Sequence, residues 1–436
     1  MHQKKIIKEY DGIGRIESDL YNLPDVEIKF CQYSDGRIKG EIKHFNYVVE
    51  LLDLLKKFIP LTIEGNTSSG GSFVFNSYVN RLSFGSNQEP SAELFGTDFE
   101  VVRIETVEDH REYDFKIEFA LLQLALFWQI KCDSPFGEFI ISPVQNSKEI
   151  LKEIKDSKIY DVTCHISFTF TSNKENLEKN IAEIVDYLES VMIPLSFAQG
   201  VFINCIYYNL YIKDAEGFKL YKSVHRSAKT KSTTSDELIG TLHIQNFLES
   251  VLPTFTKDFQ KQTGVGDAIE WYLESIRPSV IESKFVHGCI AIELLNDRFK
   301  ENKSNDKILT KGQFKKLVKE VKSVISEHIL DMDKREKMHL KIPELNRPTL
   351  KSSLRDMYDF YDISYSDLFP EFEFVEIRNQ IVHSGLSKGE FKDLLENYEK
   401  LVALLQRTLL GMLNYSGEFI DRLDNRKHKK FKKKID

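Results

Sequence analysis

The sequence contains few cysteines, and their spacing shows no pairing. The five cysteines are scattered, and none forms a CxxC pair. This pattern argues against a disulfide scaffold and against structural zinc, and it favours a reducing cytosol. No window holds 18 consecutive apolar residues, and the basic first residues are followed by no apolar stretch. We therefore expect a cytoplasmic protein with no membrane contact, no spanning helix and no signal peptide.

The composition is that of a globular protein with an uneven charge distribution. The 436 residues are 41% hydrophobic and 29% charged, with a net charge of −7. This length suggests two or three domains, and the composition excludes collagen and general disorder. The last eleven residues, 426–436, nevertheless hold seven Lys or Arg and one Asp. A basic tail on an acidic body favours contact with an anionic partner, and a merely solvated tail is the alternative.

The first half of the chain has the pattern of β-strands. Short β-branched or aromatic runs alternate with turn signals up to about residue 223. Apolar spacing predicts two helices in this half, over 47–58 and 175–192. We expect residues 1–223 to form a β-rich, sandwich-like domain with a regulatory or sensing role. The polar, Ser/Thr-rich stretch 224–240 is expected to be a linker or loop.

Helical periodicity dominates from about residue 241, and the whole chain is therefore expected to be α+β. Residues 241–425 are expected to form a bundle of about five main helices. The helices predicted by the apolar spacing are 267–276, 280–300, 312–328, 354–361, 374–383 and 388–422.

Two weaker signals are better explained without a ligand. Gly264-Val265-Gly266 follows no strand and lacks a third glycine, so it is no dinucleotide fingerprint. An acidic cluster lacks any fixed ligand geometry, and a solvated loop is the preferred interpretation over a cation site. Its members are Glu105, Glu108, Asp109, His110, Glu112 and Asp114. We predict no metal site and no cofactor.

One segment combines an arginine and a histidine inside a predicted helix. It reads Glu376-Ile377-Arg378-Asn379-Gln380-Ile381-Val382-His383-Ser384-Gly385. Arg and His recur at similar spacing in three other places, 37–44, 103–110 and 422–428. Only Arg378 and His383 lie in a helical bundle with an apolar stripe, small residues after the histidine and a long amphipathic helix following. The context therefore favours this pair over the other three.

The segment resembles the signature of HEPN domains, which are helical bundles carrying Arg, a polar residue, a few spacers and His. The helix around Ala291-Ile292-Glu293-Leu294-Leu295 is similar to an early helix of that family, and the resemblance covers about residues 245–425. A β-rich region before such a bundle is similar to the ApeA-like group of bacterial abortive-infection proteins. The resemblance implies a metal-independent ribonuclease toxin of antiviral defence, switched on by a phage-derived trigger.

These residue types fit RNA cleavage, because RNA carries its own nucleophile in the 2′-hydroxyl. His383 can accept or donate a proton near neutral pH. Arg378 can hold two phosphate oxygens at once. Asn379 lies four residues before His383, on the same helix face, and is placed to orient the imidazole or the phosphate. The expected products carry a 2′,3′-cyclic phosphate and a 5′-hydroxyl.

One histidine per chain supplies one proton-transfer group, whereas an in-line displacement is better served by two. The resemblance implies a homodimer, or a higher homo-oligomer, that joins two motifs across a two-fold axis. Glu293 is expected to support the site by pairing with Arg378, and a surface glutamate is the alternative. Six lysines of the tail are expected to hold the RNA backbone. They are Lys427, Lys429, Lys430, Lys432, Lys433 and Lys434.

Two other functions remain open from the sequence. The bundle could be a non-catalytic HEPN module for dimerisation or nucleotide binding, attached to an N-terminal ligand-binding domain. Alternatively, the β-rich half could bind a partner protein or a carbohydrate through aromatic side chains, although core packing explains those aromatics more simply. They are Phe202, Tyr207, Tyr208 and Tyr211.

Overall fold

The computed structural model of the chain contains an antiparallel β-sheet region followed by a helical region, which confirms the expected α+β class. It describes residues 5–43, 46–85, 88–103, 111–157, 160–228, 236–303, 307–387 and 389–431. The chain divides into two compact units, Met1–Glu249 and Ser250–Asp436, and each is described by itself.

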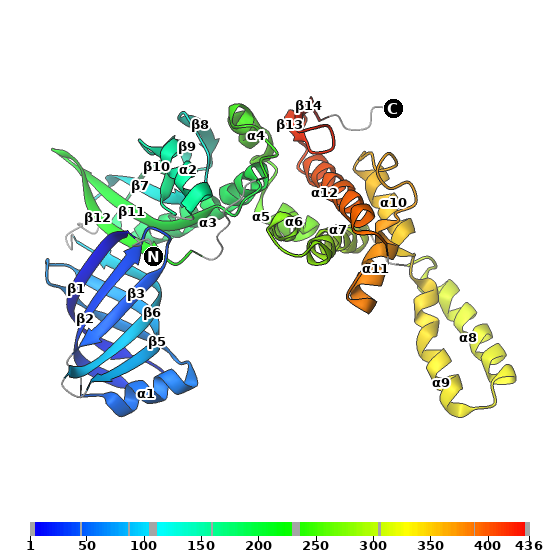
Figure 1. The fold of residues 1–436 in the computed structure, drawn as a ribbon, viewed down its shortest axis with the longest axis horizontal. Helices are drawn as coiled ribbons and strands as arrows, with labels where there is room; N and C mark the ends of the chain where they lie inside the picture. The colour runs from blue at the N-terminus through cyan, green and yellow to red at the C-terminus, as the bar shows by residue number, and fades with distance from the viewer. Residues whose placement is uncertain are drawn as a thin grey trace. The chain divides into compact units, whose positions relative to one another are not determined.

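In the first unit, six antiparallel strands close on themselves (Figure 1). The order is β3-β2-β1-β4-β5-β6, and an additional pairing of β3 with β6 completes the ring. The sequence predicted a sandwich-like arrangement; the closed sheet differs from it because β3 pairs with β6 instead of ending at an open edge. The strands are β1 Ile6–Glu17, β2 Asn22–Tyr33, β3 Ile38–Lys43, β4 Pro60–Thr67, β5 Ser72–Gly85 and β6 Gln88–Val102.

Aromatic rings fill the closed sheet. Phe30 lies 5.3 Å from Phe75 and 5.1 Å from Phe99 between ring centroids, and all three side chains are fully buried. Helix α1, Val48–Lys57, adds the buried Leu51 and Leu54 to the same core. Each such side chain contributes about 1.5–3 kcal/mol through removal of apolar surface from water.

The sheet continues past β6 through six more strands, in the order β12-β11-β7-β10-β9-β8. Helix α3, Lys174–Gln199, contacts β10 and buries residues that include Ile184 and Leu188, and helix α2, Ser147–Ser157, also contacts β10. The strands are β7 Tyr113–Leu122, β8 Ile130–Ser134, β9 Gly137–Pro143, β10 Val162–Ser172, β11 Asn204–Asp214 and β12 Gly217–Arg226. The expected helices over 47–58 and 175–192 are thus present as α1 and α3, and α2 was not anticipated.

The end of the first unit differs from the expected linker. Strand β12 runs to Arg226, and His225 is fully buried. Farther along, the backbone N–H groups of Leu238 and Ile239 both donate to the Ala198 carbonyl at the end of α3. The stretch 224–240 therefore packs on the first unit where it is described; residues 229–235 lie outside the described part. A short turn, η1 Thr241–His243, and α4, Ile244–Val251, follow.

The second unit is mainly helical. Helices α6, α7 and α12 contact one another, and α10 and α11 pack against α7. The helices are α5 Lys257–Thr263, α6 Val265–Ile276, α7 Ile281–Lys303, α8 Lys311–His328, α9 Met332–Lys341, η2 Ile342–Asn346, α10 Leu350–Phe360, α11 Phe374–Ser384 and α12 Phe391–Met412.

Two buried hydrogen bonds join the central helices. Gln406 on α12 donates to the Tyr272 hydroxyl of α6 at 2.9 Å, and Tyr398 donates to the Ser275 carbonyl at 3.0 Å. Each bond satisfies a polar group that burial would otherwise penalise. Among the described residues, no helix has both the length and the apolar character needed to span a membrane.

The last predicted helix, 388–422, is shorter in the structure. Helix α12 ends at Met412, and Asn414 has a left-handed backbone (φ 57°) that breaks the helix. The chain then forms a hairpin of β13, Glu418–Asp421, and β14, Lys427–Lys430. Part of the expected basic tail is therefore a paired strand.

Candidate functional site

Helix α11 presents the arginine and histidine of the sequence motif. Its buried residues are Phe374 at the start and Ile381 in the last turns, so the apolar spacing fixes which face packs on α7. Gly385 ends the helix with φ 77°, and its N–H donates to the Ile381 carbonyl at 2.8 Å. This left-handed ending is the one expected for Ser384-Gly385. It leaves His383 in the final turn.

Arg378 is held in place by two hydrogen bonds. Its Nη2 donates to Glu293 Oε2 at 2.9 Å, and its Nη1 donates to Asn379 Oδ1 at 3.0 Å. The side chains of Arg378 and Glu293 are only 29% and 23% exposed, so water screens the pair less than it would a surface pair. Arg378 Nε is buried and has no hydrogen-bond partner in the described part of the chain. The expected pairing of Glu293 with Arg378 is therefore present.

Two acid groups of α7 near Arg378 have raised pKa values. Burial raises the pKa of Glu293, and the charge of Arg378 opposes that rise. Cys289, one turn earlier on α7, is fully buried, and burial raises the pKa of its thiol well above the usual value. A buried, protonated thiol is a poor nucleophile. Cys289 therefore has the surroundings of an inert, structural cysteine.

His383 stands apart from this cluster. Its side chain is exposed and makes no hydrogen bond or ion pair with any described residue. His383 lies five positions after Arg378, which places the two side chains about 140° apart around α11, whereas Asn379 is about 40° from His383. One chain thus brings Arg378, Asn379 and Glu293 together, and it leaves His383 beside them on the solvent side.

A second ion pair fixes the start of α11. Lys351 on α10 pairs with Glu376 in the first turn of α11. An acidic residue at a helix N-terminus and a histidine at its C-terminus both suit the helix dipole. Helices α7 and α10 therefore each contribute one charged contact to the helix that presents the motif.

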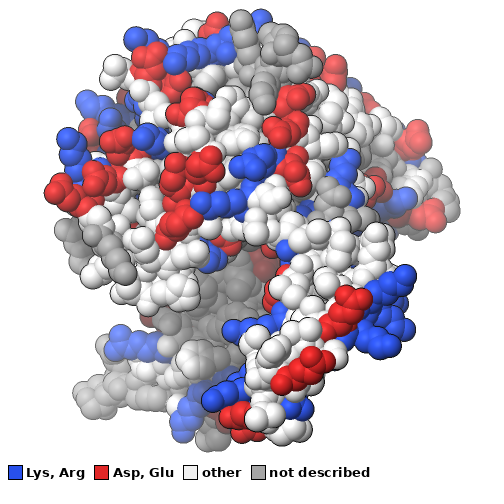
Figure 2. Space-filling model, turned by 90° about the vertical axis from the view of Figure 1, so that its right-hand side faces the viewer, with Lys and Arg blue, Asp and Glu red and all other residues white. Residues whose placement is uncertain are grey.

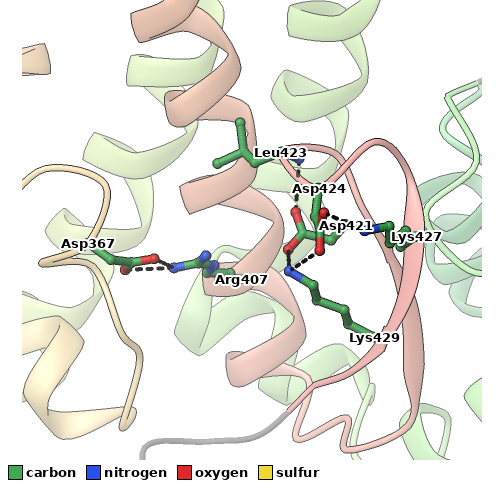
Figure 3. A network of polar contacts seen from close by, with 7 residues as sticks. All are labelled: Asp367, Arg407, Asp421, Leu423, Asp424, Lys427 and Lys429. Carbon is green, nitrogen blue, oxygen red and sulfur yellow. Dashed lines mark hydrogen bonds and ion pairs between the residues drawn. The ribbon is translucent and has the colours of Figure 1, made fainter.

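Two lysines of β14, Lys427 and Lys429, are paired with carboxylates (Figure 3). Lys429 Nζ lies 2.8 Å from Asp421 Oδ2 and 3.1 Å from Asp424 Oδ2, and Lys427 Nζ lies 3.2 Å from Asp424 Oδ1. Hydrogen bonds from Lys429 and Lys427 lower the pKa of Asp424. Phe431, directly after the strand, is buried and lies 6.0 Å from Phe419. These contacts weaken the expected role of Lys427 and Lys429 as free RNA ligands.

Of the remaining predicted residues, those that the structure describes do not join the site. Lys430 is exposed on β14, and Lys432, Lys433 and Lys434 lie outside the described residues, as do Glu105, Glu108, Asp109 and His110. From the acidic cluster, Asp114 pairs with Lys213 at 3.2 Å and accepts a hydrogen bond from Thr171 at 3.1 Å. Asp114 therefore stabilises the sheet in the part of the cluster that the structure describes.

The sequence did not reveal a charged cluster around Tyr398. Lys284 Nζ lies 4.7 Å from the Tyr398 ring centroid, and Arg422 lies 5.8 Å from it while pairing with Glu399. Burial lowers the pKa of Arg422 to about 10. The predicted helix 388–422 could not place Arg422 beside Glu399, because the contact depends on the turn after Met412. The third alternative Arg–His match, 422–428, thus has its arginine in a structural pair.

The comparisons with known proteins identify one family model. Residues 258–433 match the model described as the YopA C-terminal domain, from α5 to the end of the β13–β14 hairpin. No curated protein matches the chain, and no solved structure does. The family description names no activity, so the HEPN resemblance and its ribonuclease function stay predictions. The second unit of this chain is, over those residues, similar to a YopA C-terminal domain.

Proposed function

We propose that the protein is a metal-independent endoribonuclease whose site is built on α11. The observation that carries the proposal is the orientation of the Arg378 guanidinium, which Glu293 and Asn379 hold in place. A guanidinium has five N–H donors. Two of them bond Asn379 and Glu293, the Nε donor is buried, and one N–H on each terminal nitrogen is left for a ligand. Arg378 is therefore oriented before any ligand arrives, which lowers the entropic cost of binding a phosphate.

The chemistry needs one bond to form and one to break. The 2′-oxygen of the RNA attacks the adjacent phosphorus, and the 5′-oxygen of the next nucleotide leaves. His383 accepts the 2′-hydroxyl proton or donates one to the leaving oxygen, and its exposed position lets RNA reach it. Arg378 stabilises the charge on the phosphate oxygens, and Asn379 connects the two because it bonds Arg378 and shares a face with His383.

A second copy of the chain completes the site. One chain supplies a single histidine, whereas cleavage needs both a base and an acid. Two copies related by a two-fold axis would bring two His383 and two Arg378 side chains to one phosphate. The exposed Val382 next to His383 gives this end of α11 apolar surface to bury against the other copy. A strict monomer at working concentrations would contradict the dimeric site.

The biological role rests on the HEPN resemblance. We propose that the ribonuclease acts in the bacterial cytoplasm as a toxin of anti-phage defence. The first unit would sense a phage-derived trigger, because its closed sheet is a separate compact unit without the motif residues.

The direct test compares two histidines in matched positions. His383 lies in the last turn of α11, and His328 is the last residue of α8; both are exposed. The His383→Ala variant is expected to cleave bacterial RNA about 10²–10⁴-fold more slowly than wild type in the presence of a chelator. The His328→Ala variant should keep the wild-type rate. Equal rates for wild type and His383→Ala would reject the catalytic role.

A non-catalytic phosphate-binding module is the second candidate. It is favoured by the lack of contact between His383 and the Arg378 cluster among the described residues. In that case Arg378→Ala would abolish nucleotide binding, while no RNA would be cleaved by any form of the protein. Mass spectrometry of nucleotides released from the purified full chain distinguishes the two functions.

A further inference from the structure

Helix α8 carries a surface made only of lysine, serine and glycine. With about 100° per residue, these side chains occupy about 140° of the helix circumference. We call this surface the α8 lysine face. It consists of Lys311, Lys315, Lys316, Lys319 and Lys322, with Gly312, Ser323 and Ser326 between them.

The lysines of this face have no counter-charges. All five are exposed, and none forms an ion pair or a hydrogen bond with a residue that the structure describes. Lysines on α7 and α12, in contrast, are paired with carboxylates: Lys300 pairs with Asp297 at 2.6 Å, and Lys400 pairs with Glu396 at 2.7 Å. The two glutamates of α8, Glu320 and Glu327, lie outside the face on the helix circumference, at its edge or beyond.

The separation of charge is visible on the surface. In Figure 2, blue Lys and Arg side chains gather at the lower right edge of the molecule. In Figure 1, α8 runs alongside α9 as an antiparallel pair. Five unpaired positive charges along about 16 Å of helix repel one another, which costs stability unless an anion neutralises them. The arrangement therefore suits a ligand with regularly repeated negative charge.

The helix that carries the face is anchored before any ligand binds. At its start, Asn346 of η2 exchanges two hydrogen bonds with the Leu309 backbone, and Thr310 forms a reciprocal capping pair with Gln313. At its end, Arg335 of α9 donates to the Ser326 and Ile329 carbonyls. Anchoring at both ends holds the lysines on one broad face of the helix and reduces the entropy lost on binding.

We propose that the α8 lysine face binds the phosphate backbone of a nucleic acid. Lysine ammonium groups are strong phosphate ligands, and the small Gly312, Ser323 and Ser326 let a backbone approach closely. The Ser326 hydroxyl adds a hydrogen-bond donor for phosphate oxygens, whereas the Ser323 hydroxyl donates to Glu327 at 3.1 Å. The face offers no base-reading amide or arginine, so binding there is independent of sequence.

An anionic membrane is the competing partner, and the chemistry of the hairpin tip disfavours it. Leu330 and Met332 are 86% and 70% exposed at the tip, but Asp331 and Asp333 alternate with them. Carboxylates at these positions oppose approach to an anionic lipid surface. The lysine face itself contains no apolar side chain that could enter the headgroup region.

The choice of RNA as the probe rests on the proposed function, whereas the binding face does not depend on catalysis. Each lysine–phosphate contact with a single strand contributes about −0.7 to the slope of log K against log salt. Replacing three lysines should therefore make the slope shallower by about 2 and weaken binding about 100-fold at 0.1 M salt.

The experiment measures fluorescence anisotropy of a labelled single-stranded RNA with the full chain carrying His383→Ala, so that the probe stays intact. In this background, Lys315→Gln, Lys319→Gln and Lys322→Gln are combined. The matched control combines Lys148→Gln, Lys152→Gln and Lys155→Gln on α2, which removes the same charge from exposed positions of the other unit. Circular dichroism and thermal unfolding verify that both triple variants fold.

The expected result is a loss of about 100-fold for the α8 variant and less than about 3-fold for the α2 control. Equal losses in the two variants, or no RNA binding by the parent, would overturn the proposal. Binding of the parent to phosphatidylserine vesicles but not to RNA would also overturn it, in favour of a membrane. If RNA binds through α8 but the wild-type protein never cleaves it, the ribonuclease proposal fails and this inference stands.

Discussion

Arg378 on α11 and Glu293 on α7 are joined by an ion pair of 2.9 Å between Nη2 and Oε2, although 85 residues separate them in the sequence. The pair connects the motif helix to the centre of the second unit. It also fixes the direction of the one permanent positive charge of the motif. The candidate site is therefore a property of two packed helices, and no single short segment could supply it.

Replacing Arg378 should lower the free energy of unfolding, because the Glu293 carboxylate loses its counter-charge. Arg378→Ala leaves Glu293 partly buried without its counter-charge, and we expect a loss of about 1–3 kcal/mol in the free energy of unfolding at pH 7. Burial already raises the pKa of Glu293, so its carboxyl group takes up a proton at a higher pH than an ordinary glutamate does. The loss caused by Arg378→Ala should therefore shrink as the pH falls. Urea unfolding at two pH values measures it.

The double variant provides the control for this prediction. Adding Glu293→Gln to Arg378→Ala removes the unpaired charge, and it should restore part of the lost stability. If the double variant is as unstable at pH 7 as Arg378→Ala alone, the loss comes from packing and the ion pair is not its cause.

A buried histidine should make the first unit sensitive to acid. His225 Nδ1 lies 2.7 Å from Gln32 Oε1, its ring stacks on Phe99 at 4.2 Å, and burial lowers its pKa to about 3. The unfolded chain takes up a proton near pH 6.5, but the folded chain does so only near pH 3. Stability is therefore lost as the pH falls between these values, by about 2–3 kcal/mol at pH 4.5.

His225→Asn removes the titrating group and should reduce the difference in unfolding free energy between pH 7 and pH 4.5 by that amount. The exposed His328→Asn serves as the control and should leave the difference unchanged. An acid sensitivity that is the same in wild type and His225→Asn would show that other groups cause it.

The end of the chain should contribute to stability through Phe431. This ring is 6% exposed against Phe419, so Phe431→Ala should lower the free energy of unfolding by about 3 kcal/mol. Phe391→Ala is the control, because Phe391 is 69% exposed and its removal should cost less than about 0.5 kcal/mol. Equal effects of the two substitutions in thermal unfolding would mean that the hairpin is not packed in solution.

Local patterns predicted most of the second unit's helices. The apolar spacing placed α6, α7, α8, α10 and α11 within a few residues of their ends, because each carries an apolar stripe in its sequence, although only Ile325 of the α8 stripe is fully buried. The helix α9 was missed, since it buries none of its own side chains fully and so has no such stripe. Strand β14 was missed as well, because all four of its residues are exposed and its lysines carry the signal of a solvated tail.

Long-range pairing explains the other differences. The closure of the first sheet depends on register between β3 and β6, in which Ile38 pairs with Gly96, and no local pattern encodes such a pairing. In the site, the sequence identified Arg378, Asn379, His383 and the partner Glu293. The position of His383 on another side of α11 from Arg378 follows from helix periodicity, whereas the contact of Arg378 with Glu293 depends on how α11 packs on α7.

The measurement that tests the central claim most directly is end-group analysis of RNA treated with the wild-type protein and a chelator. One RNA carries natural 2′-hydroxyls, and a second of the same sequence carries 2′-O-methyl groups. The account predicts cleavage of the first RNA only, with 2′,3′-cyclic phosphate and 5′-hydroxyl ends, and a loss of about 10²–10⁴-fold in His383→Ala. Cleavage of both RNAs, cleavage by His383→Ala at the wild-type rate, or no cleavage by the wild-type protein would contradict it.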